Sequence, residues 1–277
     1  MTGSKILNKE LPRTTRKLRV KIAKLINKAG ASHIGSCFSI LEMLDAIYQS
    51  VDIEKIKSGA EDRDRVIISK GHSAAAVYTV LTDHGLMDED ILDTYGKKGS
   101  LLSGHVNHFV SFIEHSTGAL GHGLSVAVGI CIGMRTRGID RAKCYVLVGD
   151  GELQEGSNWE ALMMAGHLKL NRLCVLVDYN GFGGVCETPL TCSLSPLKEK
   201  FECFGFDAIE VDGHDQTAIM QAIEQAKHRS KPFAIICNTV KGKGASFMEG
   251  QNVWHYRPPS EDDCKKIRDE LFGESDQ

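Results

Sequence analysis

Two polar segments thirty residues apart contain the residue types of a metal and phosphate site. Asp150 and Gly151 follow one apolar run, 143–149, and Asn180 follows a second, 172–179. If both runs are parallel strands joined by one crossover helix, Asp150 and Asn180 lie close together at the sheet edge, where a carboxylate and an amide oxygen suit Mg²⁺ or Ca²⁺. The backbone N–H of Gly151 could bind a phosphate. Asp-Gly and Asn-Gly turns are common, so each half alone also fits an ordinary turn.

Apolar strands that alternate with helical segments would position these groups. Strands are predicted at 65–69, 143–150, 172–180, 206–213 and 232–240, and helices at 12–30, 37–50, 73–85, 118–138, 157–170 and 216–227. This alternation predicts an α/β fold with a mostly parallel central sheet and helices on both faces. We expect a single domain over residues 1–277, with mobile ends at 1–11 and 262–277 because the tail is highly charged.

The composition is that of a globular protein, with 42% hydrophobic and 25% charged residues. The net charge of -3 and the absence of a basic block disfavour nucleic acid and anionic membranes as partners. No apolar stretch is long enough to span a membrane, and the polar N-terminus lacks the apolar region of a secretory signal. The nine cysteines form no Cys-x-x-Cys pair, which favours buried thiols in the cytoplasm over zinc or disulfides.

The longer sequence around the two polar segments resembles transketolases. In that family, Gly-Asp-Gly followed about thirty residues later by Asn is the thiamine-diphosphate motif, and here it extends to GDGELQEGSNWEAL and DYNGF. Five further segments match the family in the same order: ASHIGSCFSILEML, VIISKGHSAAAVY, SGHVN, STGALGHGLSVAVG and VKGKGASFMEGQNVWH. The similarity extends from about residue 12 to 265 and implies the thiamine-diphosphate-binding fold.

The resemblance implies a role for each residue that falls in a matching motif. The divalent metal, Mg²⁺ with Ca²⁺ as a substitute, would be bound by the side chains of Asp150 and Asn180 and by the carbonyl oxygen of Phe182. The cofactor would be held by His72, Gly118, Leu120, Gly151, Glu155, Asn180, Lys241 and His255. Catalysis would depend on the four motif histidines, His33, His72, His105 and His255, because histidine exchanges protons near neutral pH. Glu155 and Glu160 are similar to acidic residues at the family's subunit interface.

No segment resembles the family's pyrimidine-binding domain, which supplies a catalytic glutamate, or its third domain. The resemblance therefore implies a partner, a C-terminal transketolase subunit, in a heterotetramer with two copies of each chain. A truncated form of a longer enzyme is the alternative explanation; the polar ends of the chain favour a natural split.

Two departures from the family pattern concern the substrate. The His33 segment reads SHIGSC where classical members have SGHPG, and the His105 segment reads SGHVNHF where many have GHPE. We therefore expect an unusual sugar or sugar phosphate as donor or acceptor. Another thiamine-diphosphate reaction, such as 1-deoxyxylulose-5-phosphate synthesis or 2-oxoacid decarboxylation, remains an alternative, as does a non-catalytic binding subunit.

Overall fold

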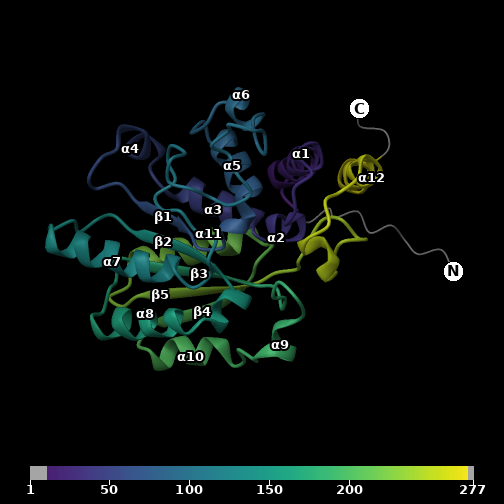
Figure 1. Ribbon diagram of the computed structural model, residues 1–277. Coiled ribbons are helices and arrows are strands. Elements are labelled where there is room, and N and C mark those ends of the chain that lie inside the picture. Colours follow the sequence, from purple (N-terminus) through teal and green to yellow (C-terminus); the bar gives the residue numbers. More distant parts are fainter. Residues whose placement is uncertain (1–10, 274–277) are drawn as a thin grey trace.

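Five parallel strands form one central sheet in the order β1-β2-β3-β5-β4 (Figure 1). The computed structural model describes residues 11–273. The strands are β1 (Arg65–Ile68), β2 (Cys144–Gly149), β3 (Leu173–Tyr179), β4 (Asp207–Asp212) and β5 (Phe233–Asn238). All five predicted strands are confirmed, with bounds that differ by at most two residues. Gly149 pairs with Asp178 and Tyr179 pairs with Asn238, so three neighbouring strands end at one edge of the sheet.

Helices cover both faces of the sheet, as predicted for an α/β fold (Figure 1). Successive strand residues belong to two hydrophobic layers; Leu147 packs in one and Val146 in the other. The first layer lies under α1 (Arg13–Ala29), α3 (Leu41–Ser50), α5 (Ala74–Asp83) and α11 (Gln216–Lys227). The second lies under α7 (Gly123–Thr136), α8 (Gly156–His167) and α10 (Leu197–Cys203). Shorter helices lie in the connections, namely α4 (Ile53–Ser58), α6 (Glu89–Leu92) and α9 (Thr188–Thr191), with 3-10 turns η1 (Gly71–Ser73), η2 (Gly151–Gln154) and η3 (Asn252–His255).

The helix predicted over 37–50 is two helices, α2 (Ile34–Ser39) and α3, which meet at Ile40. The backbone of Ile40 has φ -104° and ψ 1°, outside the helical region. The hydroxyl of Ser39 lies within hydrogen-bond distance of the carbonyl of Ser36 at 3.1 Å and of the carboxylate of Asp178 at 2.8 Å. Such side-chain bonds compete with helix propagation and explain the break.

The charged segment after Ser260 forms helix α12 (Glu261–Phe272), where the sequence suggested a mobile end. Ser260 and Asp263 form a capping box, in which each side chain accepts a hydrogen bond from the other residue's backbone N–H. Ile267 and Leu271, four residues apart, are buried where α12 packs against α1. The helical spacing of these apolar residues within the charged run explains why the segment is a packed helix and not a mobile end. The expectations for residues 1–10 and 274–277 lie outside the described residues.

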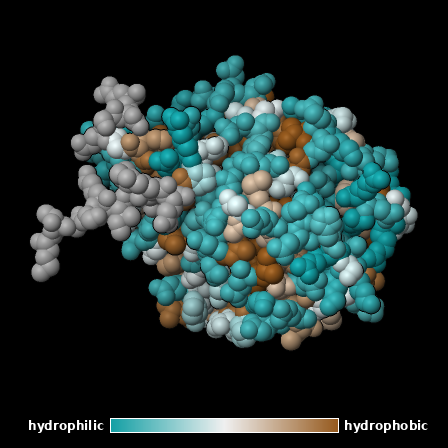
Figure 2. Space-filling view, turned by 180° about the vertical axis from the view of Figure 1, so that it is seen from behind, coloured by the Kyte–Doolittle hydropathy of each residue, from teal (hydrophilic) through white to brown (hydrophobic). Residues whose placement is uncertain are grey.

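The face in Figure 2 is largely hydrophilic and is broken by small hydrophobic areas. Within residues 11–273, no helix is long and apolar enough to cross a membrane. All nine cysteines are free, and five of them are buried: Cys37, Cys131, Cys144, Cys174 and Cys237.

Candidate active site

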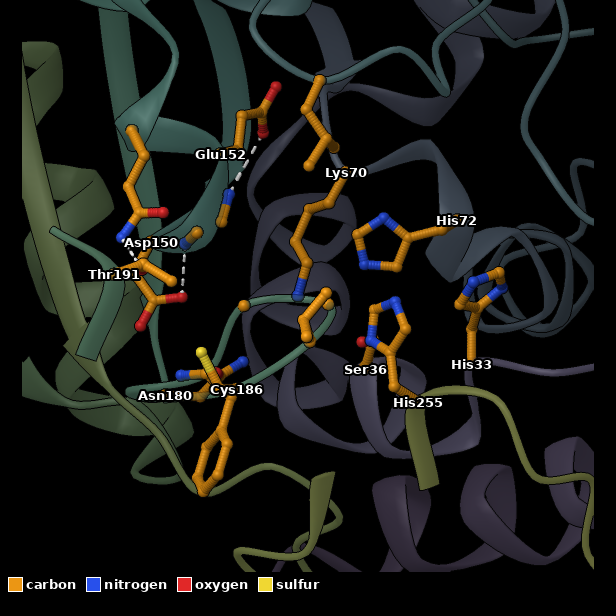
Figure 3. A pocket seen from close by; sticks show the side chains of 18 of the residues that line it. His33, Ser36, Lys70, His72, Asp150, Glu152, Asn180, Cys186, Thr191 and His255 are labelled. Carbon is orange, nitrogen blue, oxygen red and sulfur yellow. Dashed lines mark hydrogen bonds between the residues drawn. The ribbon is translucent and has the colours of Figure 1, made fainter. Parts of the chain in front are cut away.

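A cavity of about 330 Å³ opens beyond the carboxyl ends of the strands and contains most of the predicted site residues (Figure 3). Its wall includes His33, His72, His105, Gly118, Leu120, Asp150, Gly151, Asn180, Phe182 and His255. Two predicted residues, Glu155 and Lys241, are not part of the wall. The volume lies within the usual range for small-molecule and cofactor sites.

Asp150 and Asn180 both line this cavity and follow neighbouring strands, as their spacing predicted. They directly follow β2 and β3, which are neighbours in the sheet. The Oδ2 atom of Asp150 accepts a hydrogen bond from the Gly181 N–H at 2.6 Å. The Asn180 amide nitrogen donates to Asp178 at 2.8 Å, and its oxygen accepts from the Phe182 N–H at 2.9 Å. These bonds fix which end of the amide faces the 181–182 turn.

The carboxylate of Asp150 is buried without a cationic partner. Its hydrogen bonds come from the backbone N–H groups of Gly151 and Gly181, and within residues 11–273 no Lys, Arg or His side chain forms a salt bridge with it. Burial, and then the charge of Asp178, raises the pKa of Asp150 to about 7. A buried carboxylate beside an amide oxygen, with no ion-pair partner among residues 11–273, fits a divalent metal with hard oxygen ligands.

Gly151 allows two loops to approach each other closely. A Cβ atom at position 151 would lie 2.9 Å from the Cα atom of Gly183, so a larger residue would push the loops apart. In this structure the Gly151 N–H donates to Oδ1 of Asp150 at 2.7 Å. To bind a diphosphate as predicted, this N–H would have to give up its bond to Asp150 and donate to a phosphate oxygen instead.

Lys70 and Asp178 form a buried ion pair that the sequence analysis did not predict. Their side chains are 3% and 0% exposed, and Lys70 follows β1 and lines the cavity. Asp178 also accepts hydrogen bonds from Ser39 and Thr239. Burial alone would raise the pKa of Asp178, but the charge of Lys70 holds it below its usual value. A carboxylate inside an apolar strand was the available signal, because a buried charge requires a partner.

Lys241 lies behind the cavity wall. Its Nζ atom donates to Asn252 Oδ1 at 2.8 Å, to the Gly183 carbonyl at 3.2 Å and to His255 Nδ1 at 3.2 Å. Burial, and then the neighbouring charge of Lys70, lowers the pKa of Lys241 to about 8. In the chain alone, Lys241 is therefore linked to the cavity through His255.

The four motif histidines come together from four separate segments. The ring of His33 lies 4.9 Å from that of His255, 5.2 Å from that of His72 and 5.6 Å from that of His105, centroid to centroid. His33 has a φ of 73°, a strained conformation for a non-glycine residue, and its N–H donates to the His255 carbonyl at 2.9 Å. Figure 3 shows His33, His72 and His255 on one side of the cavity, Asp150 and Asn180 on the other, and the amine of Lys70 between them.

Three of these histidines, His33, His72 and His255, are held in the neutral form because their pKa values are lowered. Burial lowers the pKa of His33 to about 4, with further contributions from His105, Lys241 and Lys70. Burial, followed by Lys241, lowers the pKa of His255 to about 3, and burial followed by Lys70 lowers the pKa of His72 well below its usual value. A neutral imidazole has one nitrogen that donates and one that accepts a hydrogen bond, so the cluster can form both kinds of bond with a ligand's hydroxyl groups.

The ring C–H resonances of His33 should stay constant between about pH 8 and pH 5 and should titrate near pH 4, whereas an unperturbed histidine titrates near 6.5. The charged imidazolium is disfavoured by burial and by His105, Lys241 and Lys70, which face it. Carbon-13 spectra of the histidine-labelled chain would measure this, with His33→Gln to assign the signal. A midpoint near 6.5 for His33 would contradict it.

The glycine-rich turn at 118–122 is held by Glu152, a residue that the sequence analysis missed. Glu152 is 1% exposed, and its carboxylate accepts from the Gly121 N–H at 2.9 Å, from the Gly149 N–H at 3.2 Å and from the Ser69 hydroxyl. Gly121 has a φ of 87°, which favours glycine. Glu152 therefore shapes the turn that presents Gly118 and Leu120 to the cavity.

Glu155 and Glu160 are both exposed. Glu155 is the N-cap residue of α8 and Glu160 lies within that helix. Glu155 lies outside the cavity wall, and the cofactor contact that the resemblance implies for it stays a prediction. Its exposed position is compatible with the subunit-interface role that the resemblance also implied.

Comparisons with known proteins agree with this geometry. Residues 11–276 match the protein family described as "Transketolase, thiamine diphosphate binding domain". One subunit of the apulose-4-phosphate transketolase of Actinobacillus succinogenes is 39% identical over 268 residues, which cover 96% of this chain and 97% of that protein. The 6-deoxy-6-sulfo-D-fructose transketolase subunit of Clostridium sp. is 37% identical over 249 residues, which cover 89% of this chain and 90% of that protein.

Longer proteins match over part of their length. The transketolase of Rattus norvegicus is 33% identical over 264 residues, which cover 94% of this chain and 42% of that protein. The crystal structure of transketolase from Campylobacter jejuni superimposes with a TM-score of 0.85 at 29% identity, over 98% of this chain and 43% of that chain. The chain therefore spans about two fifths of the length of these two proteins.

Proposed function

The chain belongs to the transketolase family through its thiamine diphosphate binding domain, and from this we propose that it is the diphosphate-binding subunit of a two-chain transketolase. Such an enzyme transfers a two-carbon ketol unit from a ketose donor to an aldose acceptor. The relatives named as subunits support this proposal, because the chain covers 97% and 90% of their lengths but only 42% of the rat transketolase.

Thiamine diphosphate would bind in the cavity together with Mg²⁺, or with Ca²⁺ in its place. Asp150, Asn180 and the carbonyl oxygen of Phe182 would ligate the metal, because they supply hard oxygen ligands around a buried carboxylate that has no ion-pair partner among residues 11–273. Lys70 and His72 would face the diphosphate, and His255, held from behind by Lys241, would line the passage from the diphosphate to the substrate. The backbone from Gly118 to Leu120 would contact the aminopyrimidine ring. The bound cofactor supplies the electron sink for carbon–carbon bond chemistry.

The histidine cluster would exchange protons with the hydroxyl groups of the sugar. His33 and His105 lie in the wall beside His72 and His255. His33 is neutral well below pH 7, so one of its ring nitrogens carries no proton and can accept a hydrogen bond from a sugar hydroxyl. The role of His105 follows from its position next to His33, with ring centroids 5.6 Å apart.

A second chain would complete this site by supplying the pyrimidine-binding half and its glutamate. We propose a heterotetramer with two copies of each chain. The substrates would be small sugars or sugar phosphates, with a donor or acceptor that differs from the usual ones because the His33 and His105 segments depart from the family pattern.

The test combines this chain with a purified partner chain that resembles the pyrimidine-binding half. We expect neither chain alone to transfer ketol units, and we expect the mixture to do so with a panel of ketose donors only when thiamine diphosphate and Mg²⁺ are present. The chain alone should bind the cofactor weakly, because the pyrimidine ring lacks half of its pocket.

Two outcomes would contradict this proposal. Release of carbon dioxide from pyruvate, without ketol transfer, would assign the chain to a different thiamine-diphosphate reaction. An inability to bind thiamine diphosphate, even with Mg²⁺ and the partner, would indicate a non-catalytic subunit. Rapid turnover of xylulose 5-phosphate would retain the enzyme class but would contradict the expectation of an unusual donor.

A further inference from the structure

Tyr256 stands in the cavity wall, directly after the motif histidine His255, and the proposed roles of the site residues do not involve it. It follows the 3-10 turn η3 and is 62% exposed in this chain. Its ring lies 4.7 Å from that of His255 and 6.5 Å from that of His33, centroid to centroid. Within residues 11–273 its hydroxyl makes no hydrogen bond. Tyr256 therefore places an unused hydroxyl beside the histidine cluster.

Two polar atoms, the hydroxyl oxygen of Tyr256 and Nε2 of His255, lie close to Gly184. A Cβ atom at position 184 would lie 3.3 Å from the hydroxyl oxygen of Tyr256 and 3.5 Å from Nε2 of His255. The Gly184 carbonyl accepts a hydrogen bond from Asn252, a residue of η3, at 3.4 Å. The turn at 184 thus packs closely against η3, and because residue 184 has no side chain, none covers the Tyr256 hydroxyl or Nε2 of His255.

The hydrogen-bonding roles of these two atoms follow from their surroundings. Nδ1 of His255 lies 3.2 Å from the Lys241 amine, which is a donor, so Nδ1 accepts and Nε2 carries the proton of the neutral ring. Nε2 therefore donates toward the space above Gly184, while the Tyr256 hydroxyl can both donate and accept. One oxygen atom of a ligand could bond to both groups, and a hydroxyl group suits this pair best.

We propose that Tyr256 is a specificity-determining residue, whose hydroxyl and the Nε2–H of His255 together bind a hydroxyl group of the sugar chain in the space above Gly184. This inference rests on the proposed ketol-transfer function and extends it to a substrate contact. Val185, which is 85% exposed, lies next to Gly184 in the same wall, so the cavity mouth offers an apolar surface for the carbon chain beside this polar pair. The contact would favour sugars with hydroxyl groups beyond the transferred ketol unit.

The experiment compares two donors in the complete two-subunit enzyme. One is the best ketose from the donor panel, and the other is hydroxypyruvate, which has no hydroxyl group beyond its ketol unit. The Tyr256→Phe variant should lose roughly two- to tenfold in kcat/KM with the ketose, mainly through KM, which is the usual size for one hydrogen bond. Its kcat/KM with hydroxypyruvate should stay unchanged. Gly184→Ala places a methyl group against the Tyr256 hydroxyl and Nε2 of His255. It should also lower the ratio of kcat/KM with the ketose to kcat/KM with hydroxypyruvate.

Val253→Ala is the matched control, because Val253 is an exposed apolar residue of η3 that does not line the cavity. The ratio of its kcat/KM values for the two donors should equal that of the wild type. An equal loss with both donors in Tyr256→Phe would indicate a merely structural role and would overturn the inference, as would no loss with either donor. A wild-type complex that transfers no ketol unit would overturn the proposed function itself, so the two failures are distinguishable.

Discussion

The Asp150→Asn chain, combined with its partner subunit, should bind thiamine diphosphate and Mg²⁺ at least about 100-fold more weakly than the wild type and should lose ketol transfer in proportion. Asp150 is the only charged side chain among the three proposed metal ligands, and it is 1% exposed. Asparagine keeps the shape and one oxygen but removes the negative charge that attracts the metal. Calorimetric titration with cofactor over a series of Mg²⁺ concentrations would measure the loss.

The stability of the Asp150→Asn chain without cofactor separates this effect from misfolding. Burial and the charge of Asp178 raise the pKa of Asp150 to about 7, so folding disfavours the ionised carboxylate. A carboxyl group with a raised folded-state pKa adds stability at low pH that is lost as the pH rises toward this pKa. The neutral asparagine avoids this loss, so the apo variant should melt no lower than the wild type at neutral pH. Asp262→Asn, at an exposed position of α12, is the control. Unchanged cofactor binding in Asp150→Asn would exclude Asp150 as a metal ligand.

Asp178→Asn should destabilise the chain by roughly 3–5 kcal/mol, because it leaves Lys70 as a buried charge without its partner. The substitution keeps one oxygen that can accept a hydrogen bond from Asn180, so the expected loss arises mainly from the charge. Urea unfolding of the isolated chain, followed by circular dichroism, would measure the change in the free energy of unfolding.

A double-mutant cycle with Lys70→Met tests whether the two charges are coupled. In the Lys70→Met background there is no buried ammonium group, so Asp178→Asn should cost much less than in the wild type, and a coupling energy of about 2 kcal/mol or more is expected. Equal costs in both backgrounds would show that Asp178 stabilises the chain through Ser39, Asn180 and Thr239 alone.

The local elements could be predicted because their signals are local. Apolar runs of five to nine residues defined the strands, and helical spacing defined the segments between them. The proximity of Asp150 and Asn180 was also predictable, because neighbouring parallel strands end at the same edge of a sheet. Helix α12 was missed because charged residues dominate its composition, although Ile267 and Leu271 have the spacing of a buried face.

The sequence by itself determined the fold class, the two polar segments that follow neighbouring strands and, through its resemblance to transketolases, the set of histidines to consider. Only the tertiary structure decided which distant residues meet. His33 and His255 are 222 positions apart, yet their rings come within 4.9 Å because α2 and η3 pack together at the carboxyl edge of the sheet. Lys70, after the edge strand β1, forms an ion pair with Asp178 of β3, two strands away. The hydroxyl of Tyr256 lies close to Gly184. Periodicity predicts which face of an element is buried, but the partner of a buried charge depends on strand order and loop path, and these are determined by packing over the whole chain.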